Sequence, residues 1–159
     1  VQIDGLPVSS TRIRAAVGEG DMEEAEKLLG RPYALCGVVE HGKQLGRRLD
    51  FPTANLRWDR SKALPPKGVY AALAFVRGTW YMAAVNIGEH TTAPGGRMTV
   101  EANLIGYEGG EFYGCHMRLL LCRRLRAEKK FDSLEALREE VMRNRMQTVA
   151  YFQEKATEA

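Results

Sequence analysis

The chain of 159 residues suits one domain with a sizeable core, because 45% of its residues are apolar and 27% are charged. Its formal net charge of +3 is too small to indicate nucleic acid or a membrane surface as a partner. No apolar run is long enough to cross a bilayer, no signal peptide opens the sequence, and the three cysteines lack metal or disulfide spacing. We therefore expect a reduced cytoplasmic protein, and we expect it to be a monomer.

Residues 1–30 favour short amphipathic helices. Asp21 followed by Glu24 predicts a helix start, and Gly30 predicts the end of that helix after an apolar stripe that includes Leu28 and Leu29. We expect this segment to be a helical linker that precedes the main domain at 31–159.

Five segments after residue 32 are rich in apolar or β-branched residues and are bounded by glycine or polar breaks. The predicted strands are 33–40, 69–77, 80–87, 99–106 and 115–124. Short connections such as Arg77-Gly78-Thr79 join them. This pattern favours a mainly β fold, an antiparallel sandwich or barrel.

One long helix is predicted at the end of the chain. Asp132 followed by Glu135 predicts its N-cap. Apolar side chains then recur at helical spacing, which predicts a face packed on the β structure. These residues are Leu134, Leu137, Val141, Met142, Met146, Val149 and Phe152.

The loop at 41–48 has the composition of a phosphate-binding loop. Gly42 and Gly46 would let the backbone approach an anion, and Lys43 and Arg47 would neutralise phosphate charge.

Thr53 and Asn55 follow that loop two residues apart, so in an extended segment their side chains project to the same side. Both offer neutral oxygen, which suits Mg²⁺ shared with phosphates. The alternative is that residues 52–55 are simply a turn that leaves a strand.

The order of these motifs resembles the signature of the riboflavin kinases, and most closely the kinase module at the C-terminal end of the bacterial bifunctional riboflavin kinase/FAD synthetase. The resemblance covers roughly residues 30–150. The matching segments are Gly37-Val38-Val39, His41-Gly42-Lys43, Gly46-Arg47, Phe51-Pro52-Thr53-Ala54-Asn55, Leu64-Pro65-Pro66-Lys67-Gly68-Val69-Tyr70, Asn86-Ile87-Gly88, Thr99-Val100-Glu101, Phe112-Tyr113-Gly114, Leu125-Arg126 and Lys130-Phe131.

The resemblance implies a small antiparallel Greek-key β-barrel with a C-terminal helix packed outside. It also implies an enzyme that transfers the γ-phosphate of ATP to the 5′-hydroxyl of riboflavin, giving FMN and ADP, with Mg²⁺ as cofactor. The implied ATP and phosphate site comprises Gly37, Gly42, Lys43, Gly46, Arg47, Thr53 and Asn55, with Thr53 and Asn55 also holding the metal. The implied catalytic residue is Glu101, and Arg126 and Phe131 lie on the flavin side.

Two of these assignments have structural alternatives. Glu101 is a lone acid in an otherwise apolar or neutral strand, which would suit a general base, but it could equally be an outward-facing acid on a half-exposed strand. Arg126 could contact the flavin or belong to a solvated basic turn before the last helix.

The segment Val8-Ser9-Ser10-Thr11-Arg12-Ile13-Arg14 is similar to the motif that closes the adenylyltransferase module of the bifunctional enzyme. The earlier parts of that module are absent, and we expect this sequence to act as a capped helix and linker. The missing module is then a partner in the full-length enzyme, and we expect no FAD synthesis from these residues.

Two departures from the family pattern bear on activity. Asp50 stands where the family usually has glycine, and the segment at 86–92 lacks the usual proline-threonine ending. A barrel that binds flavin or nucleotide without turnover, for regulation, is therefore the alternative function. An RNA-binding barrel is weaker, because no aromatic side chains interleave its candidate cations for base stacking; these cations are Arg123, Arg124, Arg126, Lys129 and Lys130.

Overall fold

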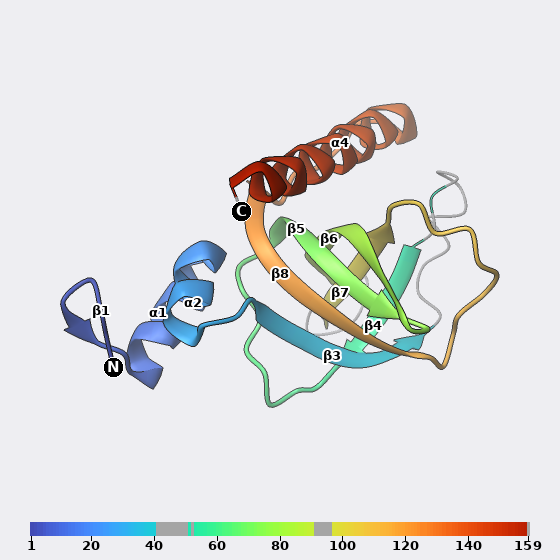
Figure 1. The fold of residues 1–159 in the computed structure, drawn as a ribbon. Coiled ribbons are helices and arrows are strands. Elements are labelled where there is room, and N and C mark those ends of the chain that lie inside the picture. Colours follow the sequence, from blue (N-terminus) through green and yellow to red (C-terminus); the bar gives the residue numbers. More distant parts are fainter. Residues whose placement is uncertain (41–50, 52, 91–96, 159) are drawn as a thin grey trace.

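A closed antiparallel barrel forms the centre of the molecule (Figure 1). The computed structural model describes residues 1–40, 51, 53–90 and 97–158. Its barrel strands are β3 (Tyr33–Glu40), β4 (Thr53–Trp58), β5 (Gly68–Val76), β6 (Thr79–His90), β7 (Arg97–Leu104) and β8 (His116–Ala127). The other elements are β1 (Gln2–Ile3), β2 (Leu6–Pro7), α1 (Ser10–Glu19), α2 (Met22–Leu29) and α4 (Leu134–Glu158).

The strands follow the order β3-β4-β7-β6-β5-β8 around the barrel. Strands β5, β6 and β7 are successive neighbours, and β8 returns to pair with β5, which is the Greek-key arrangement. This confirms the predicted mainly β Greek-key barrel with a C-terminal helix outside it.

Alternation along the strands decides which side chains face the core. In β7, Val100 and Ala102 are fully buried in the barrel core, while Glu101 between them is only half-buried. In β4, Ala54 is fully buried and Thr53 before it is half-buried. Because successive strand residues point to opposite faces, both polar side chains lie on the outer face of the barrel.

Helix α2 packs on β8 and β3 of the barrel, and α1 packs on α2. Buried residues of both helices belong to the same hydrophobic core as the barrel. Asp21 caps α2 by accepting a hydrogen bond from the backbone N–H of Glu24 (3.1 Å), and Gly30 ends it in the left-handed conformation. Both predictions are confirmed. Ser9 caps α1 through the N–H of Arg12 (3.2 Å), and the Arg12 guanidinium donates to carbonyls of the β1–β2 hairpin.

Helix α4 lies along the outside of the barrel against β5 and β6 (Figure 1). Ser133, rather than the predicted Asp132, provides its N-cap, since the Ser133 Oγ accepts from the N–H of Ala136 (3.0 Å). None of the helices in the described ranges is long and apolar enough to span a membrane.

The predicted apolar face of α4 is partly wrong. Leu134, Met142 and Met146 are exposed by 42%, 45% and 70%. The most buried residues of the helix are instead Glu140, Asn144, Thr148 and Tyr151. The helix meets polar groups on the outer face of the barrel, so its packed side needs hydrogen-bonding residues as well as apolar ones.

Candidate active site

Glu101 occupies the centre of a polar row that crosses three strands. Glu101 on β7 is paired in register with Asn55 on β4 on one side and with Asn86 on β6 on the other. Directly paired residues project to the same face of a sheet, so the carboxylate lies between two side-chain amides on the outer face. The immediate cross-strand neighbours of Glu101 are therefore polar and uncharged.

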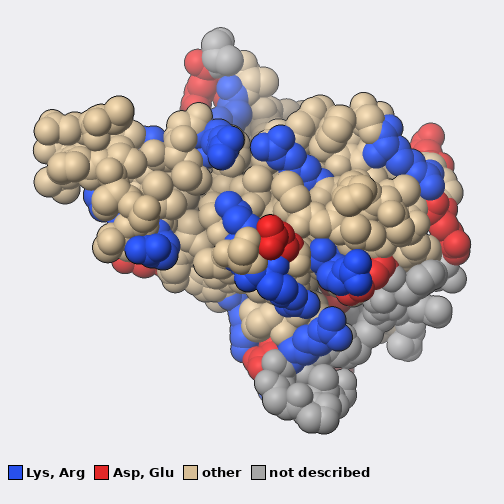
Figure 2. Space-filling model, turned by 90° about the horizontal axis from the view of Figure 1, so that it is seen from below, with Lys and Arg blue, Asp and Glu red and all other residues tan. Residues whose placement is uncertain are grey.

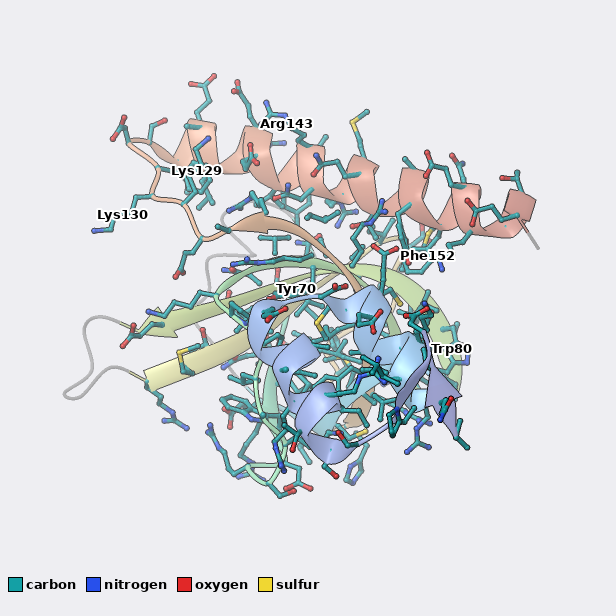
Figure 3. The ribbon with its side chains drawn as sticks, turned by 90° about the vertical axis from the view of Figure 1, so that its left-hand side faces the viewer. Tyr70, Trp80, Lys129, Lys130, Arg143 and Phe152 are labelled. Atoms are coloured by element: carbon teal, nitrogen blue, oxygen red, sulfur yellow. The ribbon has the colours of Figure 1, made fainter. Side chains whose placement is uncertain are left out.

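A cavity of about 160 Å³ lies between this outer face and α4. The barrel contributes a polar wall, and α4 and the segment before it close the opposite side. The lining residues are Thr53, Val69, Ala84, Asn86, Glu101, Asn103, Arg126, Glu128, Lys129, Phe131, Leu137, Val141 and Asn144. Figure 3 shows Lys129 and Lys130 on the connection between β8 and α4, at the edge of this region.

Four of the predicted site residues come together here although they are far apart in the sequence. Thr53, Glu101, Arg126 and Phe131 all line the cavity. Asn55 neighbours Glu101 in register but does not line the cavity. The predicted phosphate residues Gly42, Lys43, Gly46 and Arg47 lie outside the described residues, as do Asp50 and residues 91–96.

The hydroxyl of Thr53 is held by two neighbours. Its Oγ1 donates to the carbonyl of Phe51 (3.3 Å) and accepts from Nδ2 of Asn103 (3.5 Å). A hydroxyl has one proton and two lone pairs, so one lone pair stays available to a ligand. That donor set fits a hard cation, which binds neutral oxygen and completes its shell with phosphate oxygens and water.

Among the described residues, no cluster of three or more His, Cys, Asp or Glu side chains could hold a metal on its own. A cation bound at the Thr53 hydroxyl could complete its coordination shell with phosphate oxygens and water. This is the mode that Mg²⁺ uses with nucleotides.

Arg126 connects β8 to α4. Its Nε lies 3.2 Å from Oε1 of Glu140 and donates to Oδ1 of Asn144 (3.1 Å). Burial lowers the pKa of Arg126, and the guanidinium lies 5.6 Å from the ring centre of Phe131. These contacts give Arg126 a structural role at the cavity, and its predicted flavin contact stays a prediction.

Gly37 has a clear packing reason to be glycine. A Cβ at this position would lie 1.9 Å from the carbonyl oxygen of Arg57 on β4, far inside van der Waals contact. Gly37 does not line the cavity, and its predicted phosphate role stays a prediction.

Several cavity residues were not selected from the sequence. Asn103 follows Glu101 by two positions and therefore shares its face, a signal that strand periodicity offered. Glu128 lies over Gly88, where a Cβ would come within 2.8 Å of its carboxylate oxygen. Asn144 comes from α4, and only the packing of the helix brings it to the site.

The barrel and α4 thus enclose a cavity whose lining includes the carboxylates of Glu101 and Glu128 and the hydroxyl of Thr53. The family model described as Flavokinase, riboflavin kinase, matches residues 29–152. The chain therefore belongs to the riboflavin kinase family.

Two curated relatives illustrate the similarity. The chain is 38% identical over 148 residues to a bifunctional riboflavin kinase/FMN adenylyltransferase of Bacillus subtilis, covering 91% of this chain and 46% of the relative. It is 36% identical over 149 residues to the protein of the same name in Escherichia coli K12, covering 93% of this chain and 47% of that relative. The chain thus spans less than half the length of these relatives.

Two solved structures share the fold. Riboflavin kinase from Trypanosoma brucei superposes with a TM-score of 0.56 at 28% identity, covering 77% of this chain and 80% of that one. A Streptococcus pneumoniae protein described as a macrolide-efflux protein superposes with a TM-score of 0.86 at 32% identity, covering 93% of this chain and 48% of that one.

Proposed function

We propose that this chain transfers the terminal phosphate of ATP to the 5′-hydroxyl of riboflavin to give FMN, with Mg²⁺ required. Membership of the riboflavin kinase family supports the reaction. The structural observation that supports this reaction at the cavity is that Glu101 from β7, Thr53 from β4 and Phe131 all line it.

Glu101 is the residue that would orient the attacking hydroxyl and accept its proton. Asn55 and Asn86 flank the carboxylate in register and can donate hydrogen bonds that fix its direction. A positioned base of this kind contributes about 10²–10⁴-fold to the rate. The remaining catalysis would come from holding the two substrates in line.

Thr53 and Asn55 are the residues that would hold Mg²⁺. The ion would supply positive charge to the phosphates as charge develops during transfer. The glycine-cation loop that includes Lys43 and Arg47 would bind the same phosphates. On the flavin side, Phe131 offers an aromatic face and Arg126 a cation close to it.

We also propose the cellular setting. Residues 31–159 act as the kinase domain, and 1–30 act as a helical linker at the end of an adenylyltransferase module. The relatives' bifunctional names support such a module as the partner in a longer protein. The domain works as a monomer in the cytoplasm, with ATP and riboflavin as its substrates.

The RNA-binding alternative finds no support in the described contacts. Arg123 pairs with Glu23 (2.9 Å), Arg124 donates to the carbonyl of Lys67 (2.7 Å), and Arg126 is held by α4. Figure 2, which views the molecule from the side opposite α4, shows Lys and Arg spread in separate groups over that face.

Formation of FMN from riboflavin, ATP and Mg²⁺ tests the proposal. Product is separated by chromatography from reactions with the purified chain, with and without a chelator of divalent cations. We expect FMN that depends on the metal. Saturable riboflavin binding without FMN would instead support the regulatory binding module.

A further inference from the structure

Arg145 reaches from α4 to the barrel and has no part in the reaction as described so far. Its Nη1 donates to Oδ1 of Asn103 and to the carbonyl of Leu104 (3.0 Å). The same guanidinium lies 4.8 Å from the ring centre of Phe51. Burial lowers the pKa of Arg145, and its hydrogen bonds to Asn103 and Leu104 offset the cost of burying the guanidinium. The contribution of the Arg145 guanidinium at this position is its hydrogen-bond donors, which bind Asn103 and Leu104.

Those donors determine which way the side-chain amide of Asn103 points. A guanidinium can only donate, so it must face the amide oxygen and not the amide nitrogen. The nitrogen of Asn103 is thereby directed to Thr53, whose Oγ1 it meets at 3.5 Å. Without Arg145, the amide could rotate and present its oxygen to Thr53 instead.

Arg145 thus contacts both residues that hold the Thr53 hydroxyl. Phe51, under the guanidinium, provides the carbonyl that accepts the Thr53 proton, and Asn103 provides the N–H that occupies one lone pair. With both partners fixed, the last lone pair of Thr53 has one direction.

We propose that Arg145 is a positioning residue for the divalent cation: through Asn103 and Phe51 it fixes the orientation of the Thr53 hydroxyl, so that one lone pair is presented to the metal. This inference deepens the proposed function and rests on Thr53 as a metal ligand. Outer partners of metal ligands typically change metal affinity or activity by about 10–100-fold when they are removed.

Binding of Mn²⁺ in the presence of ADP tests the proposal without turnover. Mn²⁺ accepts the same oxygen ligands as Mg²⁺, and its paramagnetism reports the bound ion through water proton relaxation. Arg145→Met should raise the Mn²⁺ dissociation constant by about 10–100-fold. Arg138→Met, which removes an exposed cation from the same helix, should leave the constant near that of the wild type.

A second variant removes the intermediate residue and leaves Arg145 in place. Asn103→Leu should weaken Mn²⁺ to a similar degree, and Arg145→Lys, which retains a donor, should recover part of the loss. In the kinase assay, Arg145→Met should raise the Mg²⁺ concentration for half-maximal rate by the same factor, while kcat at saturating Mg²⁺ stays within about threefold. Thermal unfolding establishes that each variant is folded.

Unchanged Mn²⁺ binding in folded Arg145→Met or Asn103→Leu would overturn the inference, as would equal losses in Arg145→Met and the Arg138→Met control. Wild-type protein that binds no Mn²⁺ with ADP would overturn it as well. Wild-type protein that binds Mn²⁺ in the predicted way but forms no FMN would contradict the proposed function and leave this inference standing.

Discussion

Replacement of Glu140 by Gln should destabilise the domain strongly, because it removes the charge that balances Arg126 beside the cavity. The carboxylate is 9% exposed and the Arg126 side chain 20% exposed, with 3.2 Å between Oε1 and Nε. Arg143 on the same helix also pairs with this carboxylate, and Figure 3 shows Arg143 on α4. Glu140→Gln preserves the volume and one acceptor but removes the carboxylate that is paired with the half-buried Arg126 guanidinium.

The magnitude follows from the separation and the burial. At 3.2 Å and an effective dielectric constant near 20, the gross attraction is about 5 kcal/mol. Loss of one member of a buried pair typically costs about 3–5 kcal/mol. Arg126 retains the acceptor on Asn144 and some contact with water, so we expect a loss of about 2–3 kcal/mol in the free energy of unfolding.

Urea unfolding at neutral pH measures this loss. Glu139→Gln is the matched control, since Glu139 is an exposed acid adjacent to Glu140 on the same helix. Surface substitutions usually change stability by less than about 0.5 kcal/mol. If Glu140→Gln stays within that range, or if the two variants lose the same amount, the ion pair does not hold Arg126 as described.

Three further predictions concern the metal site, the N-terminal segment and alkaline pH. Thr53→Val and Asn55→Ala should each abolish most FMN formation at low Mg²⁺ while circular dichroism stays unchanged; wild-type rates in the folded double variant would contradict the metal assignment. The purified chain supplied with FMN and ATP should form no FAD above background, and FAD in that reaction would show that the interpretation of residues 8–14 is wrong. Burial raises the pKa of Tyr70 to about 12, so the folded protein retains a proton that the unfolded chain releases near pH 10. Stability should therefore fall as the pH rises through that interval, and fall less in Tyr70→Phe, as measured by urea unfolding.

The barrel was predictable from the sequence because its strands carry strong local signals. Apolar and β-branched runs end at glycine or polar residues, and the strand at Tyr33–Glu40 has the bounds that the pattern predicts. The cap of α2 was equally clear, since Asp21 and Gly30 act through local backbone geometry. Such features depend on neighbours in sequence and need no tertiary context.

Features that depend on tertiary contacts were harder to predict. Strand β4 is short and follows Pro52, and its residues were interpreted as a motif that could be a turn. The two-residue strands β1 and β2 are too short to show a period. The packed face of α4 is polar because it meets Arg126, and only the register of the barrel reveals that partner.

The same distinction applies to the site. Motifs selected Thr53, Glu101, Arg126 and Phe131, and the structure brings all four to one cavity. The sequence could not show that Asn55 and Asn86 flank Glu101, because register between strands depends on the closed barrel. It also gave no sign that Arg145 would reach Asn103, since the two residues are joined only when α4 docks.

Single-turnover FMN formation by Glu101→Gln tests the central claim most directly. The variant retains the shape and hydrogen-bonding reach of the side chain but cannot accept the proton of the attacking hydroxyl. At saturating riboflavin and Mg²⁺-ATP, the rate should fall by about 10²–10⁴-fold, with little change in the binding of either substrate. A folded variant within about threefold of the wild-type rate would contradict the claim, because that change lies outside the range of a general base.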